Sequence, residues 1–243
     1  MCVVLASGAA GMFASAQAAD LAATPVYTKA NVVEEWNPWM IHVRGVAVFA
    51  DGKSSLHVLG APGVDSPNSG LSFGEIGTAE LGVSYFFSPN LAAALILGVP
   101  HSAPIKGTGL LAGLPVGKST GLAPSLTFQY HFTQFGAFQP YIGVGVNYTT
   151  FINTRAANEL AFVPAGPIQT TRLSIGNSTG PVAQFGFDYM IDRHWGLNFD
   201  VKRIWLRPEY SATSHVISVG DLPVGGTAHI DPWVVGGGVT YKF

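Results

Sequence analysis

The chain has 243 residues, enough for one membrane barrel or for one to two soluble domains. Only 11% of the residues are charged and the formal net charge is −2, which excludes the strongly basic surface of a nucleic-acid-binding protein. The mean hydropathy is positive, a composition that is unusual for a soluble protein.

The first residues have the composition of an export signal. Residues 1–19 contain no charged side chain, are rich in Ala, Gly and Ser, and end in the small-x-small sequence AQA at 16–18. We therefore predict a signal peptide over 1–19, with cleavage near Ala18/Ala19. The usual basic region before the apolar segment is missing, which questions the start site. The single cysteine, Cys2, lies in this segment, so thiol chemistry is not expected of the mature chain.

Beyond residue 19 the chain divides into a short leader and a patterned region. Residues 20–38 contain prolines and charged residues and are expected to form a polar leader on the periplasmic side. Residues 39–243 contain eight segments in which apolar residues alternate with polar or small ones, the period of a β-strand. The predicted strands are 40–49, 79–87, 91–99, 122–132, 139–151, 180–191, 195–206 and 231–243.

The last predicted strand, DPWVVGGGVTYKF, has the most informative face. Trp233, Val235, Val239, Tyr241 and Phe243 share this face, with aromatic residues near both ends. An edge strand of a soluble β-sandwich is one interpretation. An outer-membrane barrel explains the pattern better, because its aromatic residues mark the two membrane interfaces and its aliphatic residues contact lipid. The terminal Phe243 also resembles the signal that the barrel assembly machinery reads, which makes that machinery an expected partner.

A transmembrane helix is the alternative for residues 81–105, which contain no Asp, Glu, Lys or Arg. The sequence SPN at 88–90 interrupts this run and Pro100 ends it. The uninterrupted apolar piece, Leu91–Val99, has nine residues. A helical span needs roughly 20 residues and a tilted membrane strand about 9–11, so the pattern favours a strand.

The segments between the predicted strands alternate in length. Short turns are expected at 88–90, 133–138 and 192–194, and long loops at 50–78, 100–120, 152–178 and 207–230. Short turns on the periplasmic side are typical of bacterial barrels. Because every backbone amide in hydrocarbon must be paired, the strands have to close on themselves. The sequence therefore predicts an all-β fold over 39–243: an eight-stranded antiparallel transmembrane β-barrel with short periplasmic turns and long extracellular loops.

Aromatic residues gather at both ends of the predicted strands. Those beside the short turns are Tyr130, Phe132, Tyr141, Trp195, Tyr241 and Phe243. Those beside the long loops are Tyr148, Phe151, Trp205 and Trp233. We expect the two groups to form the aromatic girdles at the membrane interfaces.

Four blocks of sequence point to a family. They are LAPSLTFQYHF (122–132), QPYIGVGVNYTTF (139–151), FGFDYMIDRHWGLNFDVKRIWL (185–206) and IDPWVVGGGVTYKF (230–243). In order and spacing they resemble the OmpW/AlkL-type small outer-membrane proteins, over most of the mature chain. The resemblance implies a barrel whose outer half encloses a hydrophobic pocket that passes small apolar molecules inward, in some members through a side opening. The predicted loops 50–78 and 152–178 match the family too weakly for gate residues to be carried over.

An eight-stranded barrel has an interior that its own side chains about fill. The inward-facing polar residues are Arg44, Glu80, Gln129, His131, Asp188, Asp200 and Lys202. Because both charge signs are present, we expect these residues to pair across the lumen as a structural polar plug. A role as an ion pathway is the alternative. A wide water-filled porin is disfavoured, since it needs roughly 16 strands.

The predicted long loops are less polar than loops that face water and charged lipopolysaccharide should be. Their candidate pocket residues are Leu56, Val58, Leu110, Leu111, Leu114, Leu160 and Phe162. Such side chains would line an apolar cup above the plug, and ligand sites are typically concave and mostly apolar. A solute held there would escape more easily into lipid than through the plug. The alternative is that these residues only pack the loops together.

Enzymatic motifs are not found. The seven histidines lack a metal-ligand spacing such as HxxxH, and there is no G-x-S-x-G sequence. We expect no catalytic residue, metal or cofactor, with an embedded hydrolase as a minor alternative. The prediction is an outer-membrane conduit for passive uptake of small hydrophobic molecules, with membrane lipid, lipopolysaccharide and apolar solutes as partners. The alternative is a non-transporting barrel for envelope integrity, adhesion, or phage or bacteriocin docking.

Overall fold

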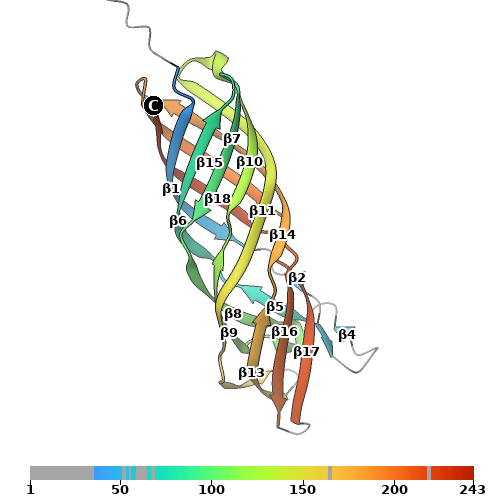
Figure 1. The fold of residues 1–243 in the computed structure, drawn as a ribbon. Helices are drawn as coiled ribbons and strands as arrows, with labels where there is room; N and C mark the ends of the chain where they lie inside the picture. Colours follow the sequence, from blue (N-terminus) through green and yellow to red (C-terminus); the bar gives the residue numbers. More distant parts are fainter. Residues whose placement is uncertain are drawn as a thin grey trace, which may run out of the picture. The chain divides into compact units, whose positions relative to one another are not determined.

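Each of the eight predicted strands corresponds to one strand of a closed barrel in the computed structural model (Figure 1). The structure describes residues 36–50, 53–54, 56–58, 65–66, 69–163, 166–217 and 220–243, so the predicted signal peptide and most of the predicted leader lie outside the described residues. The barrel strands are β1 (Trp39–Phe49), β6 (Ile76–Phe86), β7 (Leu91–Gly98), β10 (Ser125–His131), β11 (Phe138–Ala156), β14 (Ser178–Met190), β15 (Trp195–Ile204) and β18 (Trp233–Lys242). In the described parts of the chain, no helix has the length and apolar character needed to cross a membrane.

The barrel closes because its first strand pairs with its last. In the antiparallel β1–β18 ladder, Met40 lies opposite Lys242 and Phe49 lies opposite Trp233. On its other side β1 pairs with β6, and the ladder continues through β7, β10, β11, β14 and β15 to β18. Closure pairs each strand on both sides, which is what a lipid environment requires of backbone amides. The predicted eight-stranded antiparallel barrel is confirmed.

The segments predicted as long loops contain many strands, and the structure corrects the prediction in this respect. These strands are β2 (Lys53–Ser54), β3 (Leu56–Val58), β4 (Asp65–Ser66), β5 (Gly70–Phe73), β8 (His101–Thr108), β9 (Pro115–Leu122), β12 (Leu160–Val163), β13 (Gly166–Ile175), β16 (Glu209–Val216) and β17 (Gly220–His229). β11 continues beyond the barrel to pair with β9, which pairs with β8. β13, β16 and β17 belong to a second antiparallel sheet. Pairing with neighbouring strands satisfies backbone groups that a loop would have to leave to water.

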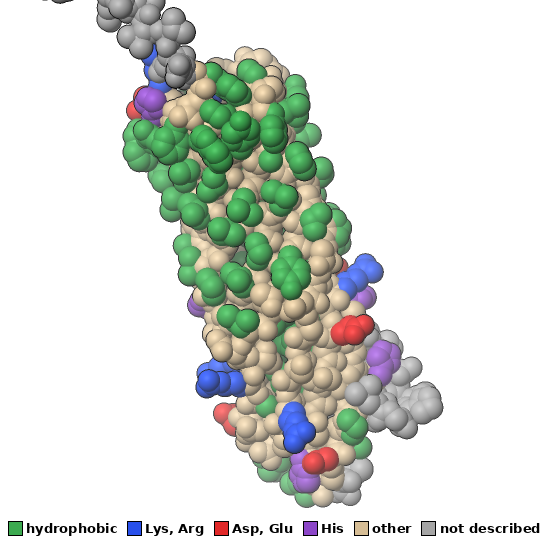
Figure 2. All heavy atoms as spheres, viewed as in Figure 1, with side chains coloured by type: hydrophobic (Ala, Val, Ile, Leu, Met, Phe, Trp, Pro, Cys, Tyr) green, Lys and Arg blue, Asp and Glu red, His purple; other side chains and the backbone are tan. Residues whose placement is uncertain are grey.

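The outward face of the barrel is apolar. Figure 2 shows hydrophobic side chains gathered over the visible face of the eight-stranded part. Phe128 on β10 and Val144 on β11 lie opposite each other in the ladder, and both side chains are exposed. The residues beside Phe128, Thr127 and Gln129, are buried inside the barrel. This alternation of lipid-facing and interior residues is the one that the period-two pattern predicts.

Aromatic rings cluster beside the short turns. The Tyr241 ring contacts the rings of Trp195 and Phe243, with centroid distances of 4.8 and 4.9 Å. Tyr141 was assigned to the same girdle, and that assignment is wrong: its side chain is buried inside the barrel. Tyr141 is two residues from Gly143 and shares its inward face, so strand periodicity decides its direction and aromatic character does not.

Candidate functional site

The polar residues of the barrel interior form one hydrogen-bonded network. All seven residues predicted for the plug are buried: Arg44, Glu80, Gln129, His131, Asp188, Asp200 and Lys202. They come from five strands, and the closure of the barrel brings their inward faces together. Because a buried charge needs a partner, the contacts of these residues determine what the interior can do.

Three ionic contacts form the part of the network farthest from the short turns. Oε1 of Glu80 accepts hydrogen bonds from Nη1 of Arg44 at 2.7 Å and from Nζ of Lys202 at 2.8 Å. Nζ of Lys202 also donates to Oδ1 of Asp200 at 2.7 Å. Two cations thus balance two carboxylates. Mutual pairing of this kind offsets part of the cost of removing four charges from water.

Neutral donors extend the network towards the short turns. Oδ2 of Asp200 accepts from the Tyr141 hydroxyl at 2.7 Å and from Nε2 of Gln184 at 2.6 Å. Oε1 of Gln184 accepts from Nε2 of Gln129 at 3.0 Å, and Oε1 of Gln129 lies 3.1 Å from Nε2 of His131. Tyr141 and Gln184 are not among the predicted plug residues, although the strand period of two, applied strictly, puts both on inward faces.

Asp188 organises the remaining contacts. Its Oδ1 accepts from Nδ2 of Asn198 at 2.9 Å and from the Thr240 hydroxyl, and lies 3.2 Å from Nε2 of His42. His42 and Asn198 are likewise interior residues that the predicted plug omitted. Strand alternation identifies them as inward-facing, but only the closed barrel shows which atoms they reach.

Glycines in the middle of the strands make room for these side chains. A Cβ atom at Gly186 would lie 2.6 Å from the Tyr141 hydroxyl. A Cβ atom at Gly143 would lie 3.1 Å from Cγ of Gln129 and 3.3 Å from Oε1 of Gln184. The mid-strand glycines therefore have specific packing partners, the larger side chains of the network.

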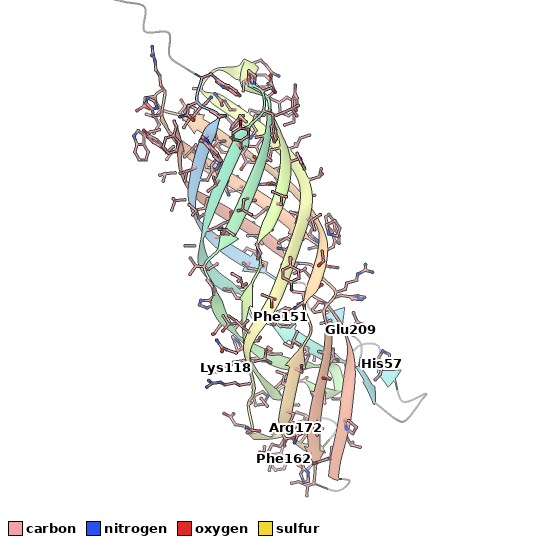
Figure 3. All side chains as sticks on the ribbon, viewed as in Figure 1. His57, Lys118, Phe151, Phe162, Arg172 and Glu209 are labelled. Carbon is pink, nitrogen blue, oxygen red and sulfur yellow. The ribbon has the colours of Figure 1, made fainter. Side chains whose placement is uncertain are left out.

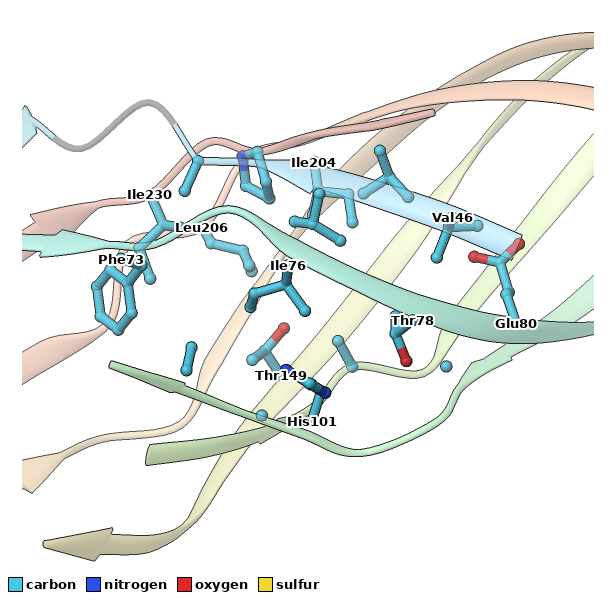
Figure 4. A pocket seen from close by; sticks show the side chains of 18 of the residues that line it. Val46, Phe73, Ile76, Thr78, Glu80, His101, Thr149, Ile204, Leu206 and Ile230 are labelled. Atoms are coloured by element: carbon cyan, nitrogen blue, oxygen red, sulfur yellow. The ribbon is translucent and has the colours of Figure 1, made fainter. Parts of the chain in front are cut away.

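A cavity of about 170 Å³ lies on the side of this network away from the short turns. Figure 4 shows Glu80 at one end of it and Phe73 and Ile230 at the other. Its apolar lining residues include Val46, Val48, Ala50, Phe73, Ile76, Ile96, Val99, Ala103, Ala123, Phe151, Ile204, Leu206, Ile230, Pro232 and Val234. Glu80 and Lys202 also line it, so the ionic network forms its floor.

The barrel wall has a break in its ladder beside this cavity. The β7–β10 ladder ends at the pair Ile96 and Ser125, and the β8–β9 ladder begins at the pair His101 and Gly121. The residues between these two pairs are not joined to each other by ladder pairing. All four residues that end the two ladders line the cavity.

The residues in the break favour an open wall. Pro100 and Pro124 lie there, and proline has no N–H to donate to a ladder. Gly98 and Val99 line the cavity from the same segment, and the Val99 side chain is 56% exposed. A Cβ atom at Gly98 would meet no other atom within 4 Å. Small or outward-turned side chains therefore leave space at this point of the wall.

None of the predicted pocket residues whose side chains the structure describes lines this cavity. Leu111 and Leu114 are buried with Ile105 in a hydrophobic cluster that also contains cavity-lining residues, such as Val46 and Ile204. Leu160 and Phe162 are 49% and 84% exposed on β12, which corrects their assignment to a pocket (Figure 3). They lie on a strand whose alternate residues turn outward, which a loop prediction does not anticipate.

Three further predicted pocket residues remain as predictions. Leu56 and Val58 lie on β3 and Leu110 lies in the short 3₁₀ helix η1 (Gly109–Leu111). Their side chains lie outside what the structure describes. The cavity is lined instead by inward residues of strands, such as Val46 and Ile204, and by Phe151 where β11 leaves the barrel (Figure 3).

Residues 39–243, which include the whole barrel and its cavity, match the OmpW family. The chain belongs to the OmpW family. An uncharacterized outer-membrane protein of Sinorhizobium fredii, y4mB, is 44% identical over 239 residues, covering 98% of this chain and 94% of its own. Outer membrane protein AlkL of Ectopseudomonas oleovorans is 28% identical over 178 residues, covering 73% and 70%. The crystal structure of OprG from Pseudomonas aeruginosa matches with a TM-score of 0.73 at 26% identity, covering 84% of this chain and 95% of that one.

OmpW family membership places this barrel in the outer membrane, and the predicted family and location are confirmed. Its lipid-facing surface therefore has membrane lipid and lipopolysaccharide as its surroundings. For this OmpW-family barrel, the question that remains is what the cavity above the polar network receives.

Proposed function

We propose that this outer-membrane barrel is a conduit for passive uptake of small hydrophobic molecules. The observation that carries the proposal is an apolar cavity that ends on a paired ionic floor, Glu80 and Lys202. The cavity is large enough for a small solute, because an engineered apolar cavity of about 150 Å³ in another protein binds benzene. The resemblance to OmpW/AlkL-type proteins carries the same expectation.

We further propose that the solute leaves sideways into the bilayer. Passage straight through the barrel would require an apolar molecule to separate Glu80 from Lys202 and Asp200 from Tyr141, which are buried contacts that an apolar molecule cannot replace with hydrogen bonds of its own. The break between the two ladders lies beside the cavity, and Val99 within it is exposed on the outside of the wall. In this scheme the seven predicted polar residues act as a plug that directs the solute to the wall.

Uptake of a labelled medium-chain alkane tests the proposal. Its rate is measured in cells with and without the protein, at matched amounts of folded barrel. We expect faster uptake only when the protein is present. Equal rates for several apolar solutes would contradict the conduit and favour a non-transporting barrel for envelope integrity, adhesion or phage or bacteriocin docking.

Two glycine substitutions test lateral release. Gly98→Phe and Gly121→Phe place a ring on the inward face beside the break, where an added Cβ has no neighbour within 4 Å. Gly45→Phe is the matched control, because Gly45 also has free space but lies on the lipid face of β1. We expect slower uptake with the first two variants and unchanged uptake with the control. Unchanged uptake in all three folded variants would exclude this exit and leave the conduit itself standing.

A further inference from the structure

The floor of the cavity has hydrogen-bonding capacity that the plug does not use. An ammonium group has three N–H donors, and Nζ of Lys202 directs two of them to Glu80 and Asp200. The Ser125 hydroxyl accepts from Nδ2 of Asn147 at 3.0 Å, and its own proton has no acceptor among the described residues. Both Lys202 and Ser125 line the cavity. Two donors therefore face a space whose walls are otherwise mainly apolar.

The charges of the floor decide which acceptor fits these donors. Arg44 and Lys202 are balanced by Glu80 and Asp200 through the contacts described above. A carboxylate head group would bring a further negative charge next to Glu80, and a cationic head group would bring a further positive charge next to Lys202. An uncharged oxygen acceptor adds no charge, so it can use the spare donors without disturbing the balance.

We propose that the cavity selects molecules with an apolar body and one uncharged hydrogen-bond acceptor at one end, such as medium-chain ketones and alcohols. The acceptor lies at the floor, on Lys202 and Ser125, and the apolar body lies along Val46, Ile204 and Val234. This inference rests on the proposed function, since it assigns the solute class of the same cavity.

The test compares three probes of equal chain length: heptane, 2-heptanone and heptanoate. Binding to the purified barrel in lipid nanodiscs is followed through the backbone NMR resonances of Ser125 and Lys202, at matched solute concentrations in the bilayer. We expect 2-heptanone to half-saturate the barrel at about fivefold lower concentration than heptane, because one neutral hydrogen bond strengthens binding by about that factor. Heptanoate should bind weakest of the three.

Two variants test whether Ser125 and Lys202 donate the hydrogen bonds to the acceptor of the solute. Ser125→Ala removes one donor while Nδ2 of Asn147 keeps the carbonyl oxygens of Ala123 and Pro124 as acceptors, so the fold should tolerate it. Lys202→Met removes the other donor. Each should reduce the preference for the ketone, whereas Ser102→Ala, on β8 and outside the cavity lining, should leave it unchanged. If Lys202→Met does not fold, Ser125→Ala decides.

The outcomes separate this inference from the proposed function. Equal half-saturation by heptane and 2-heptanone would overturn the head-group selection and leave a conduit for apolar solutes in place. A ketone preference that is unchanged in Ser125→Ala would overturn the assignment of Ser125. No binding and no uptake with any of the three probes would count against the proposed function as well.

Discussion

Nζ of Lys202 lies 2.8 Å from Oε1 of Glu80, and both side chains also border an apolar cavity. This contact is the boundary between two environments in one barrel. On one side the interior is filled by paired polar groups, and on the other it is lined by aliphatic side chains. A solute that enters from the apolar side therefore meets a charged floor and not a continuous channel.

The first prediction concerns the stability of this boundary. Lys202→Met leaves Glu80 and Asp200 buried with less compensation, and we expect the free energy of unfolding to fall by about 3–5 kcal/mol. The measurement is urea unfolding of the barrel in lipid vesicles. Lys118→Met is the control: Lys118 is exposed and has no ion pair among the described residues, so its change should stay within about 0.5 kcal/mol. Equal losses in the two variants would contradict the structural role of the boundary.

The second prediction concerns the cavity. Ile204→Trp fills space beside the floor, and we expect it to remove most of the protein-dependent uptake of a labelled alkane. Phe162→Ala should leave uptake unchanged, because the Phe162 side chain points away from the cavity. Loss of uptake in Phe162→Ala with no loss in Ile204→Trp would contradict this cavity as the solute site. It would favour the pocket that the sequence predicts among the long loops.

A third prediction follows from the close approach of two strands. A Cβ atom at Gly145 would lie 2.0 Å from the backbone oxygen of Leu126, so Gly145→Ala must displace the β10–β11 ladder. We expect a loss of about 1–3 kcal/mol in the free energy of unfolding. Gly45→Ala, where the added atom meets nothing within 4 Å, is the matched control and should unfold like the parent protein. A tolerated Gly145→Ala would show that the ladder can shift.

The fourth prediction concerns pH and the turn after β14. Oδ1 of Asp192 accepts hydrogen bonds from the backbone N–H groups of Trp195 and His194, at 2.7 and 2.8 Å, and these bonds lower the pKa of Asp192 below its ordinary value of 3.8. Because the folded-state pKa is the lower one, the ionised carboxylate stabilises the fold above pH 3.8 and loses that effect as the pH falls through the lowered value.

We therefore expect Asp192→Ala to be less stable than the parent protein at neutral pH, with a difference that shrinks in acid. The measurement is the urea midpoint of both proteins across the acidic range. Asp192→Asn keeps an acceptor but also lacks the titrating carboxylate, so the difference between Asp192→Asn and Asp192→Ala should not change with pH. A difference between Asp192→Ala and the parent protein that stays constant down to the lowest pH would rule out the carboxylate as its source.

The fifth prediction concerns Phe243. We expect Phe243→Ala to lower the amount of barrel that reaches the outer membrane, because we propose that the barrel assembly machinery reads the aromatic residue that follows β18. Refolding of the purified protein into vesicles should change little, since the backbone bond from Phe243 N–H to the Trp39 oxygen remains. Phe128→Ala, which removes another lipid-facing ring, serves as the control. Equal yields of the two variants in the membrane would exclude a special role for Phe243 in assembly.

Local pattern was enough to predict the barrel and the composition of its interior. Strand side chains alternate with a period of two, so the residues around Arg44 or Asp200 already define which face turns inward. The same rule, applied strictly, places Tyr141, Gln184 and Asn198 in the interior. The girdle prediction for Tyr141 is wrong because it rests on the aromatic character of the residue and not on its position in the strand period.

The structure of the segments predicted as long loops differs from the prediction for a physical reason. β8, β9, β13 and β16 contain prolines, glycines and small polar residues that weaken the alternation. Part of their pairing is with strands distant in sequence, β9 with β11 and β13 with β16. An apolar residue between the barrel strands, like Leu114 before β9 or Phe162 on β12, can face the core or the solvent. Only the register of the hairpin decides between the two.

The sequence by itself therefore determined the eight strands, their inward and outward faces, the polar character of the interior and the family. Only the tertiary structure decided that Val46, Ile204 and Ile230 meet around one cavity, that Lys202 and Glu80 close its floor, and that the wall ladder is broken beside it. The reason is that alternation along a strand fixes the direction of a side chain. The stagger between strands of a closed barrel fixes its depth, and that stagger depends on partners far away in the chain.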